Sequence, residues 1–294
     1  MKKTFLVSTL ALAMGLVTMQ AQAHSRWILP LQPIVSGDES EWVSFDVSAS
    51  NTLFQADKPA RLDGMVALMP DGSQGVAVEG YTDKRRSVFS YELTQPGTYK
   101  FEQTNEGYMV MRERPQGAEP PKAEGDKPQG EGKPGMGPQG PGRGMRADTL
   151  EALLAQLPDD GKAKHIVHSL SRVETFVTRG KPTDAALKPT NKGIEMVPLT
   201  HPADLFTGEP ATFQFLLNGK PAADLAVELT PGGTAYRNER LTQSLKTDSE
   251  GKVKVEWPMA GPYLVEVEDE VKLSEGKVNS ERYGYFATLV VQPQ

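Results

Sequence analysis

Short segments in which apolar and polar residues alternate, separated by turns rich in proline and glycine, recur along most of the chain. In EWVSFDVS at 41–48, Val43, Phe45 and Val47 fall on one side and the residues between them are polar. Alternation with a period of two is typical of a strand with one buried face. Comparable segments lie at 64–69, 87–93, 98–103, 211–217, 225–230, 252–257, 263–268 and 283–291. The pattern predicts an all-β protein with two immunoglobulin-like or prealbumin-like β-sandwich domains.

A weak internal repeat indicates that the two sandwiches have a related design. LDGMVALMPDG at 62–72 is followed by QPGTYKFE at 95–102, and ADLAVELTPGG at 223–233 is followed by AGPYLVEVE at 260–268. In each copy a strand ends in a Pro-x-Gly turn, and a Gly-x-Tyr sequence comes roughly 30 residues later. The alternative explanation is that unrelated β-sandwiches use the same Gly-x-Tyr turn by convergence.

The first 23 residues have the three parts of a secretory signal peptide. Lys2 and Lys3 precede an apolar run at 5–17, and Ala21 and Ala23 form a small-x-small cleavage site. We expect cleavage after Ala23, export to the periplasm and no membrane-spanning segment. The loss of both lysines changes the net charge from −6 to −8, which disfavours nucleic acid as a partner. The chain has no cysteine, so its domains must be stable without disulfides.

Two segments of unusual composition interrupt the strand pattern. Between 114 and 146, sixteen of 33 residues are glycine or proline, and none is Val, Ile, Leu or aromatic, which predicts a disordered insertion. DTLEALLAQL at 148–157 has leucines at helical spacing after Asp148, a candidate N-cap, and predicts one short helix.

Strand character returns at 163–178, which contains Ile166, Val167, Val173, Phe176 and Val177. We expect this strand to pair back with the first sandwich. The predicted domains are therefore a first sandwich at 24–180, a linker at 181–193 and a second sandwich at 194–294.

Cleavage after Ala23 makes His24 the first residue of the mature protein. A histidine at this position can chelate a metal through its α-amine and Nδ1, which an internal histidine cannot do. Copper and nickel favour nitrogen ligands of this kind, and both groups lose their protons at modest cost near neutral pH. An accidental histidine after the cleavage site is the alternative interpretation.

Three other histidines are candidate partners of His24. His165 and His168 lie three apart in HIVH, so they share a face on a helix but point to opposite sides on a strand. The surrounding pattern predicts a strand, and at most one of the two can then face a given site. His201 lies in a loop before a strand, where a structural role is the simpler explanation.

Methionines could supply soft thioether ligands to Cu(I), but they give a weaker signal. Met136 and Met145 lie in the insertion, and Met109 and Met111 lie in a predicted strand, where packing or surface exposure is the simpler explanation. Signatures of catalysis are missing, since the chain has no cysteine nucleophile, no Gly-x-Ser-x-Gly elbow, no phosphate loop and no zincin histidine pair. We therefore expect no catalytic residues and no enzymatic activity.

Several motifs together resemble a known family. They are a signal peptide that ends directly before a histidine, the H-x-x-W-x-x-P start formed by His24, Trp27 and Pro30, and the stretches beginning EMVPLTHPADLF and TDSEGKVKVEW. In these the chain resembles periplasmic components of nickel and cobalt uptake systems, which are otherwise grouped as a domain of unknown function. The resemblance implies two β-sandwich lobes and a role in handling divalent transition metals.

Three functional hypotheses follow. The favoured one is a periplasmic accessory protein for nickel, cobalt or copper uptake or homeostasis, with His24 as the primary ligand and an inner-membrane metal transporter as a possible partner. A non-catalytic structural or interaction module of the cell envelope is the alternative, in which His24 is incidental. A copper-dependent oxidative enzyme comes third, because it needs a second histidine beside His24 and an exposed aromatic substrate face.

Overall fold

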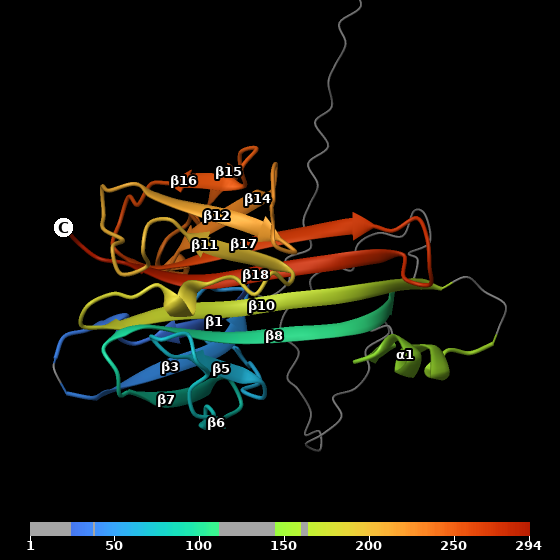
Figure 1. Cartoon of the computed structure of the whole chain (residues 1–294), viewed down its shortest axis with the longest axis horizontal. Helices are drawn as coiled ribbons and strands as arrows, with labels where there is room; N and C mark the ends of the chain where they lie inside the picture. The colour runs from blue at the N-terminus through green and yellow to red at the C-terminus, as the bar shows by residue number, and fades with distance from the viewer. Residues whose placement is uncertain (1–24, 38, 112–144, 160–163) are drawn as a thin grey trace, which may run out of the picture.

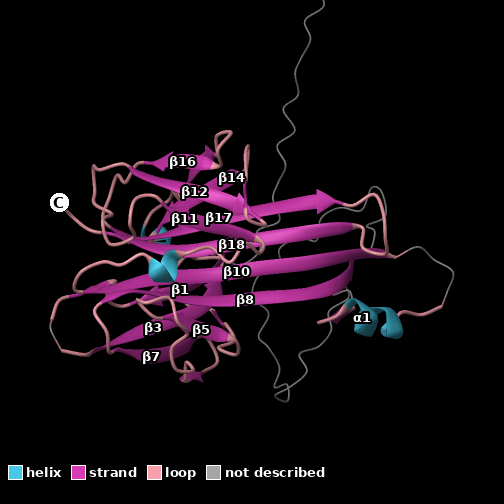
Figure 2. Cartoon of the chain, in the orientation of Figure 1, coloured by secondary structure: helices cyan, strands magenta, loops and turns pink. Residues whose placement is uncertain are grey.

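The computed structural model describes residues 25–37, 39–111, 145–159 and 164–294. Within them the chain forms three β-sheets, one short α-helix and two turns of 3-10 helix (Figures 1 and 2). The all-β class predicted from the alternating pattern is confirmed. His24, the predicted signal peptide and most of the Gly/Pro-rich insertion lie outside the described residues.

The first outer sheet contains the strands nearest the start of the chain. Its strands run in the order β1, β3, β7, β6. The short strand β4 pairs with the end of β3 on the same edge as β7. Their bounds are β1 Ser25–Pro30, β3 Glu41–Ser50, β4 Lys58–Pro59, β6 Gly80–Thr82 and β7 Ser87–Leu93. The strands predicted at 41–48 and 87–93 are thus present as β3 and β7.

A central sheet runs through the whole molecule in the order β15, β14, β17, β18, β10, β8, β5, with β2 paired to β10 and β9 paired to β8. The bounds are β2 Ile34–Val35, β5 Met65–Leu68, β8 Gly97–Met111, β9 Arg146–Ala147, β10 His165–Arg179, β14 Ala226–Pro231, β15 Gln243–Lys246, β17 Gly261–Lys272 and β18 Ser280–Val291. β10 pairs antiparallel with β8 over its full length, which confirms that the strand predicted at 163–178 returns to the first sandwich. β10 also pairs parallel with β18, so one sheet connects the two halves of the chain.

The second outer sheet has the order β11, β12, β13. Strand β16 pairs with the first half of β12, on the same edge as β13. Its bounds are β11 Ile194–Pro198, β12 Ala211–Leu217, β13 Lys220–Pro221 and β16 Lys252–Val255. A two-residue hairpin joins β12 to β13 through Asn218 and Gly219, which have φ of 50° and 76°. Asparagine and glycine tolerate this left-handed backbone, which suits the twist of a tight hairpin.

The two outer sheets cover opposite faces of the central sheet (Figure 1). The first core contains Phe45 and Phe89 from the first outer sheet together with Phe101 and Val173 from the central sheet. The second core takes alternate residues of the same central strands, such as Phe176, and packs them against the second outer sheet. We call the two faces of the central sheet the first and second face accordingly. Because residues of a strand alternate between faces, this register assigns each central side chain to one face.

The internal repeat is present in the structure as two equivalent corners. β5 pairs with β8, and β14 pairs with β17, so each Pro-x-Gly strand lies beside its Gly-x-Tyr strand. Tyr99 donates its hydroxyl to the Gln95 carbonyl at 2.9 Å, and Tyr263 donates to the Met259 carbonyl at 3.0 Å. Gly97 and Gly261 have similar φ of 129° and 123°, which side chains rarely adopt. The two sandwiches therefore share a local design.

The helix and the end of the insertion differ slightly from the predictions. Helix α1 spans Leu150–Gln156, and its N-cap is Thr149, whose hydroxyl accepts from the Ala152 N–H at 3.2 Å. The predicted cap, Asp148, is wrong by one residue. Arg146, predicted as the end of the disordered insertion, belongs to strand β9 because β8 extends far enough to pair with it.

The predicted linker at 181–193 packs against the rest of the protein. It contains the 3-10 turn η1, Ala185–Leu187, whose Ala186 and Leu187 side chains are buried. The second 3-10 turn, η2, spans Thr234–Tyr236. No helix among the described residues is long and apolar enough to cross a membrane.

Candidate functional site

The start of β1 is held in place by Trp27. Its side chain is 1% exposed, and its ring makes an edge contact with Phe54 at a centroid distance of 5.6 Å. The indole Nε1–H donates to Oδ1 of Asp46 at 3.0 Å, and the Ser48 hydroxyl donates to the same oxygen at 2.7 Å. A buried indole that is both packed and hydrogen-bonded fixes the strand around it. Trp27 therefore anchors the start of β1 against the rest of the first outer sheet.

Ser25, the first described residue, lies beside a group of carboxylates on the first face of the central sheet. Its side chain is buried and forms a hydrogen bond with the Glu266 carboxylate of β17. Glu228 of β14 lies directly opposite Glu266 in the sheet, and Glu268 follows on the same face of β17. Like charges in these positions repel each other.

The electrostatics of Glu266 reflect this crowding. Burial raises the pKa of Glu266, and the charges of Glu228 and Glu268 raise it further. The hydrogen bond from Ser25 and the charge of Arg240 act in the opposite direction but do not cancel the rise. Glu266 is therefore a carboxylate whose charged form lacks sufficient compensation.

The predicted ligand His24 lies outside the described residues, so its chelate stays a prediction. In the described part of the chain, no three His, Asp or Glu side chains converge closely enough to hold a metal ion.

The structure does not bring the three candidate histidine partners together. His165 and His168 lie on β10, where they point to opposite faces of the central sheet, as the strand pattern predicted. His165 is on the first face, the same face as Glu266. Val173 of β10 lies opposite Phe286, which lies opposite Glu266, so these three residues form one row across the sheet. His165 is eight residues from Val173, and about 26 Å of strand therefore separates His165 from the row of Glu266. His165 and Glu266 cannot bind one metal ion together.

His168 lies on the second face and is occupied by local contacts. Its ring stacks on Tyr108 at a centroid distance of 4.6 Å, and Nε2 lies 3.0 Å from Oε1 of Glu106. Nδ1 lies 3.6 Å from Oε1 of Glu281. The central sheet separates this ring from the carboxylates beside Ser25.

His201 has the structural role that its loop position suggested. Its Nδ1 accepts a hydrogen bond from the Ala203 N–H at 3.0 Å, so Nε2 carries the proton. Nε2 lies 3.1 Å from the Thr98 hydroxyl and 3.4 Å from the Thr183 carbonyl. Nδ1 thus bonds within the loop itself, and Nε2 connects the loop to β8 and to the linker.

A buried network of charges on the second face was not anticipated from the sequence. Arg172 of β10 pairs with Glu102 of β8 and, at 3.4 Å, with Glu195 of β11. Lys100 contacts Glu102 at 3.0 Å, and Glu174 accepts a hydrogen bond from the Tyr285 hydroxyl. The Glu195 carboxylate also accepts from the backbone N–H groups of the linker residues Thr190, Asn191 and Lys192. The network therefore connects the linker, β11 and the central sheet.

Ionisation in this network follows its geometry. Burial would raise the pKa of Glu102, but Lys100 and Arg172 outweigh it and lower the pKa below its usual value. Burial raises the pKa of the fully enclosed Glu174, with Lys100 and Arg172 opposing the rise. These carboxylates already have partners in the protein, which makes the network a structural element and not a ligand site.

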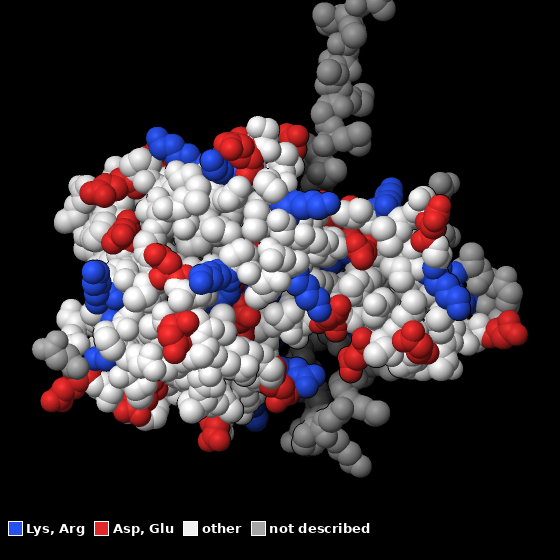
Figure 3. Space-filling model, in the orientation of Figure 1, with Lys and Arg blue, Asp and Glu red and all other residues white. Residues whose placement is uncertain are grey.

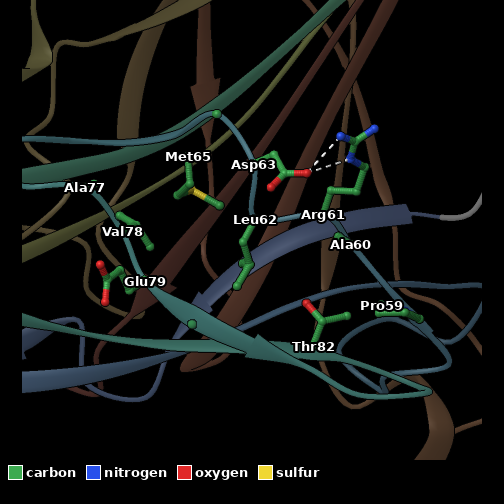
Figure 4. Close-up of a pocket in the computed structure, with 12 residues that line it drawn as sticks. Pro59, Ala60, Arg61, Leu62, Asp63, Met65, Ala77, Val78, Glu79 and Thr82 are labelled. Carbon is green, nitrogen blue, oxygen red and sulfur yellow. Dashed lines mark hydrogen bonds and ion pairs between the residues drawn. The ribbon is translucent and has the colours of Figure 1, made fainter. Parts of the chain in front are cut away.

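An open groove of about 690 Å³ lies beside the first outer sheet (Figure 4). It is lined by the segment 59–65 and by residues 77–80 and Thr82. The exposed Arg61 and Asp63 side chains pair with each other at 2.8 Å at its rim. The face of the molecule shown in Figure 3 carries basic and acidic side chains interspersed, without a field of one sign. Neither feature supplies converging ligands.

The carboxylates beside Ser25 are the site residues that the sequence analysis missed. The alternation in VEVEDEV at 265–271 places Glu266 and Glu268 on one face, and that signal was available. The pairing of β14 with β17, which brings Glu228 opposite Glu266, depends on long-range register.

A known family model matches most of the chain. Residues 21–270 match the model of a family described as a domain of unknown function (DUF4198). The chain belongs to this family. The description assigns the family no activity, and no curated protein matches the chain.

Solved structures similar to the chain include two of Escherichia coli alpha-2-macroglobulin, one activated by porcine elastase and one activated by trypsin. The identities are 10% and 11%, and the TM-score is 0.19 for both. The matches cover 90% of this chain but only 31% and 23% of those proteins, so this chain spans less than a third of their length. A TM-score of this size supports no conclusion about fold or function.

Proposed function

We propose that this protein is an exported, metal-binding accessory for nickel, cobalt or copper uptake or homeostasis in the periplasm, with His24 as its primary ligand. The signal-peptide pattern that ends at Ala23 supports export and a free amine on His24. The family resemblance supports a role in transition-metal handling and an inner-membrane metal transporter as the partner.

The observation that carries the proposal is the hydrogen bond between Ser25 and Glu266. Across a trans peptide bond, the residue bonded to Ser25 has its Cα about 3.8 Å from that of Ser25. The proposal puts the amine and the imidazole of His24 within reach of Glu266, with Glu228 and Glu268 on the same face. A dication would add to the positive charge of Arg240, which acts on Glu266, and of Arg26, which acts on Glu268.

The chemistry of the combined groups suits a transition metal. The α-amine and Nδ1 of a terminal histidine provide two nitrogen ligands, and Glu266 can provide an oxygen. Mixed nitrogen and oxygen ligands are typical of Cu(II) and Ni(II) sites. Because the amine and the imidazole must lose protons to bind, affinity should increase with pH around neutrality.

The central experiment compares two N-termini by titration calorimetry with Ni(II) and Cu(II). The mature protein that begins at His24 should bind the metal, and a variant with one alanine added before His24 should bind at least ~10-fold more weakly, about 1.4 kcal/mol. The extension converts the α-amine to an amide but keeps the imidazole. His24→Ala should weaken binding to a similar degree.

The carboxylate is tested with Glu266→Gln, which keeps the size of the side chain. We expect weaker metal binding than in the wild type, whereas Glu256→Gln, a control in an exposed ion pair with Lys254, should leave affinity unchanged. Equal affinity of the native and the extended N-terminus would contradict the proposal. That result would favour the alternative, a non-catalytic interaction module of the envelope.

A further inference from the structure

The ends of β8 and β10 extend beyond both outer sheets (Figure 1) and place two methionines and a histidine on one face. Met109 and Met111 are two residues apart on β8, so both lie on the first face of the central sheet. His165 is directly opposite Met111 in the antiparallel pair, and Val167 is opposite Met109. The register is continuous over fifteen paired residues, from His165 opposite Met111 to Arg179 opposite Gly97.

These methionines do not pack in either hydrophobic core. Neither Met109 nor Met111 belongs to the two core clusters, whereas Met65 and Met196 do. Met111 is 36% exposed, compared with 7% for Met65 and 4% for Met196. Of the two simpler explanations, core packing therefore does not account for Met111, and surface exposure stays as the alternative to a ligand role.

Strand geometry brings the three side chains within reach of one ion. Residues directly opposite each other have Cβ atoms about 4.5–5.5 Å apart, as Met111 and His165 do by register, and diagonal neighbours such as Met109 and His165 are about 7–8 Å apart. Methionine is long and unbranched, so its sulfur can swing toward a shared point between the two strands.

We propose that Met109, Met111 and His165 form a site for a soft monovalent metal ion, Cu(I) or Ag(I). Thioether sulfurs select soft ions, and an imidazole nitrogen completes a three-ligand set suited to Cu(I). Ni(II) and Co(II) gain little from thioethers, so this site differs in selectivity from the chelate proposed at His24. It is also separate in space, because about 26 Å of strand lies between His165 and the row of Glu266.

The charges near the site are mixed. The Arg146 guanidinium lies 3.8 Å from the Met109 sulfur and has to move aside when a cation binds. On the other side, the charges of Glu270 and His165 act on each other, and Glu270 pairs with Arg282 at 2.9 Å. A monovalent ion requires less charge compensation here than a dication.

The test uses the full mature chain and Ag(I), a redox-stable probe for Cu(I), in competition with a chromogenic chelator. We expect 1:1 binding, with affinity at least ~10-fold lower in Met109→Leu/Met111→Leu and in His165→Ala. Leucine keeps the volume and the apolar character of methionine, and unchanged thermal melting would show that each variant is folded. In methionine-methyl NMR of the wild type, the signals of Met109 and Met111 should shift on addition of Ag(I).

Met145 provides a matched control, because it is 37% exposed at the same end of β8 but pairs with Val110, whose side chain is on the opposite face. Met145→Leu should bind Ag(I) as the wild type does. Wild-type affinity in the double leucine variant, or an equal loss in Met145→Leu, would overturn the proposal. The alanine-extended N-terminus should keep full Ag(I) binding while losing Ni(II) binding, so each of the two proposed sites can fail without the other.

Discussion

The two sandwiches place a glutamate at the same position but provide different surroundings for it. Glu102 follows Tyr99 by three residues, and Glu266 follows Tyr263 by three, so the shared corner puts each carboxylate on the face of the central sheet opposite to its tyrosine. Glu102 is enclosed by Lys100 and Arg172, which lower its pKa. Glu266 is crowded by other carboxylates, and its pKa is raised.

This difference separates a structural charge from one that is available to a ligand. Around Glu102 the cations are Lys100 of the same strand and Arg172 of the neighbouring strand β10. Arg172 also pairs with Glu195 of β11 and so connects the network to the second half of the protein. Around Glu266 the hydroxyl of Ser25 and the charge of Arg240 give partial compensation. The repeat thus supplied two equivalent positions, and only the second one keeps unsatisfied negative charge beside the mature N-terminus predicted from the sequence.

The largest expected effect comes from removing the cation in the first half. Arg172→Met should destabilise the protein by about 3–5 kcal/mol, because it leaves Glu102 and Glu195 buried without their partner. Urea denaturation followed by tryptophan fluorescence measures the change. The matched control is Arg282→Met, which breaks an exposed pair with Glu270 and should change stability by at most about 1 kcal/mol. Similar losses in the two variants would show that the buried network has no special structural role.

The two tyrosine corners should differ by a smaller amount. The Tyr99 hydroxyl donates to the Gln95 carbonyl and also accepts from the Gln95 N–H at 2.7 Å, whereas Tyr263 makes the single bond to Met259. Tyr99→Phe should therefore cost about 1–3 kcal/mol, and Tyr263→Phe about 0.5–1.5 kcal/mol. Equilibrium unfolding of both variants tests the order, and a larger loss for Tyr263→Phe would contradict it.

Strands whose apolar and polar residues alternate clearly could be predicted from the sequence. SVFSYEL at 87–93 alternates clearly and forms β7 with the predicted bounds. Residues 104–108 lack such alternation, yet β8 runs through them to the strand predicted at Met109 and Met111, because pairing with β10 supplies backbone hydrogen bonds that sequence period does not reveal. The parallel pairing of β10 with β18 joins residues more than a hundred positions apart, and no turn signal specifies it.

The candidate site could be predicted only in part for the same reason. His24 and the opposite orientation of His165 and His168 follow from cleavage rules and strand period. The carboxylate beside Ser25 comes from β17, and its neighbour Glu228 comes from β14, so their proximity depends on sheet order. Lys100, Glu102, Arg172 and Glu174 interrupt apolar strands at alternate positions, which is a readable sign of a buried polar face.

The smallest expected effect is the pH dependence of stability, which should have opposite signs for Glu266 and Glu102. The raised pKa of Glu266 means that the native state holds this proton to higher pH than the unfolded chain, whose glutamates titrate near ~4.3. Stability from this group is greatest below that value and is lost as pH rises through the folded pKa. Glutamine carries no charge, so Glu266→Gln avoids this loss of stability at neutral pH. The metal-free variant should melt a few degrees higher than the wild type at pH 7–8, a gain in the free energy of unfolding of about 1 kcal/mol at most.

Glu102 has a depressed pKa, and the sign is therefore reversed. Its stabilisation is present above ~4.3 and disappears as pH falls through the lower folded pKa, so Glu102→Gln should melt below the wild type at pH 7 and approach it in acid. Melting curves of both variants from pH 3 to 8, recorded with a chelator, decide the matter. Shifts of the same sign would mean that the two carboxylates have equivalent surroundings in solution, and the argument for a ligand at Glu266 would lose its electrostatic support.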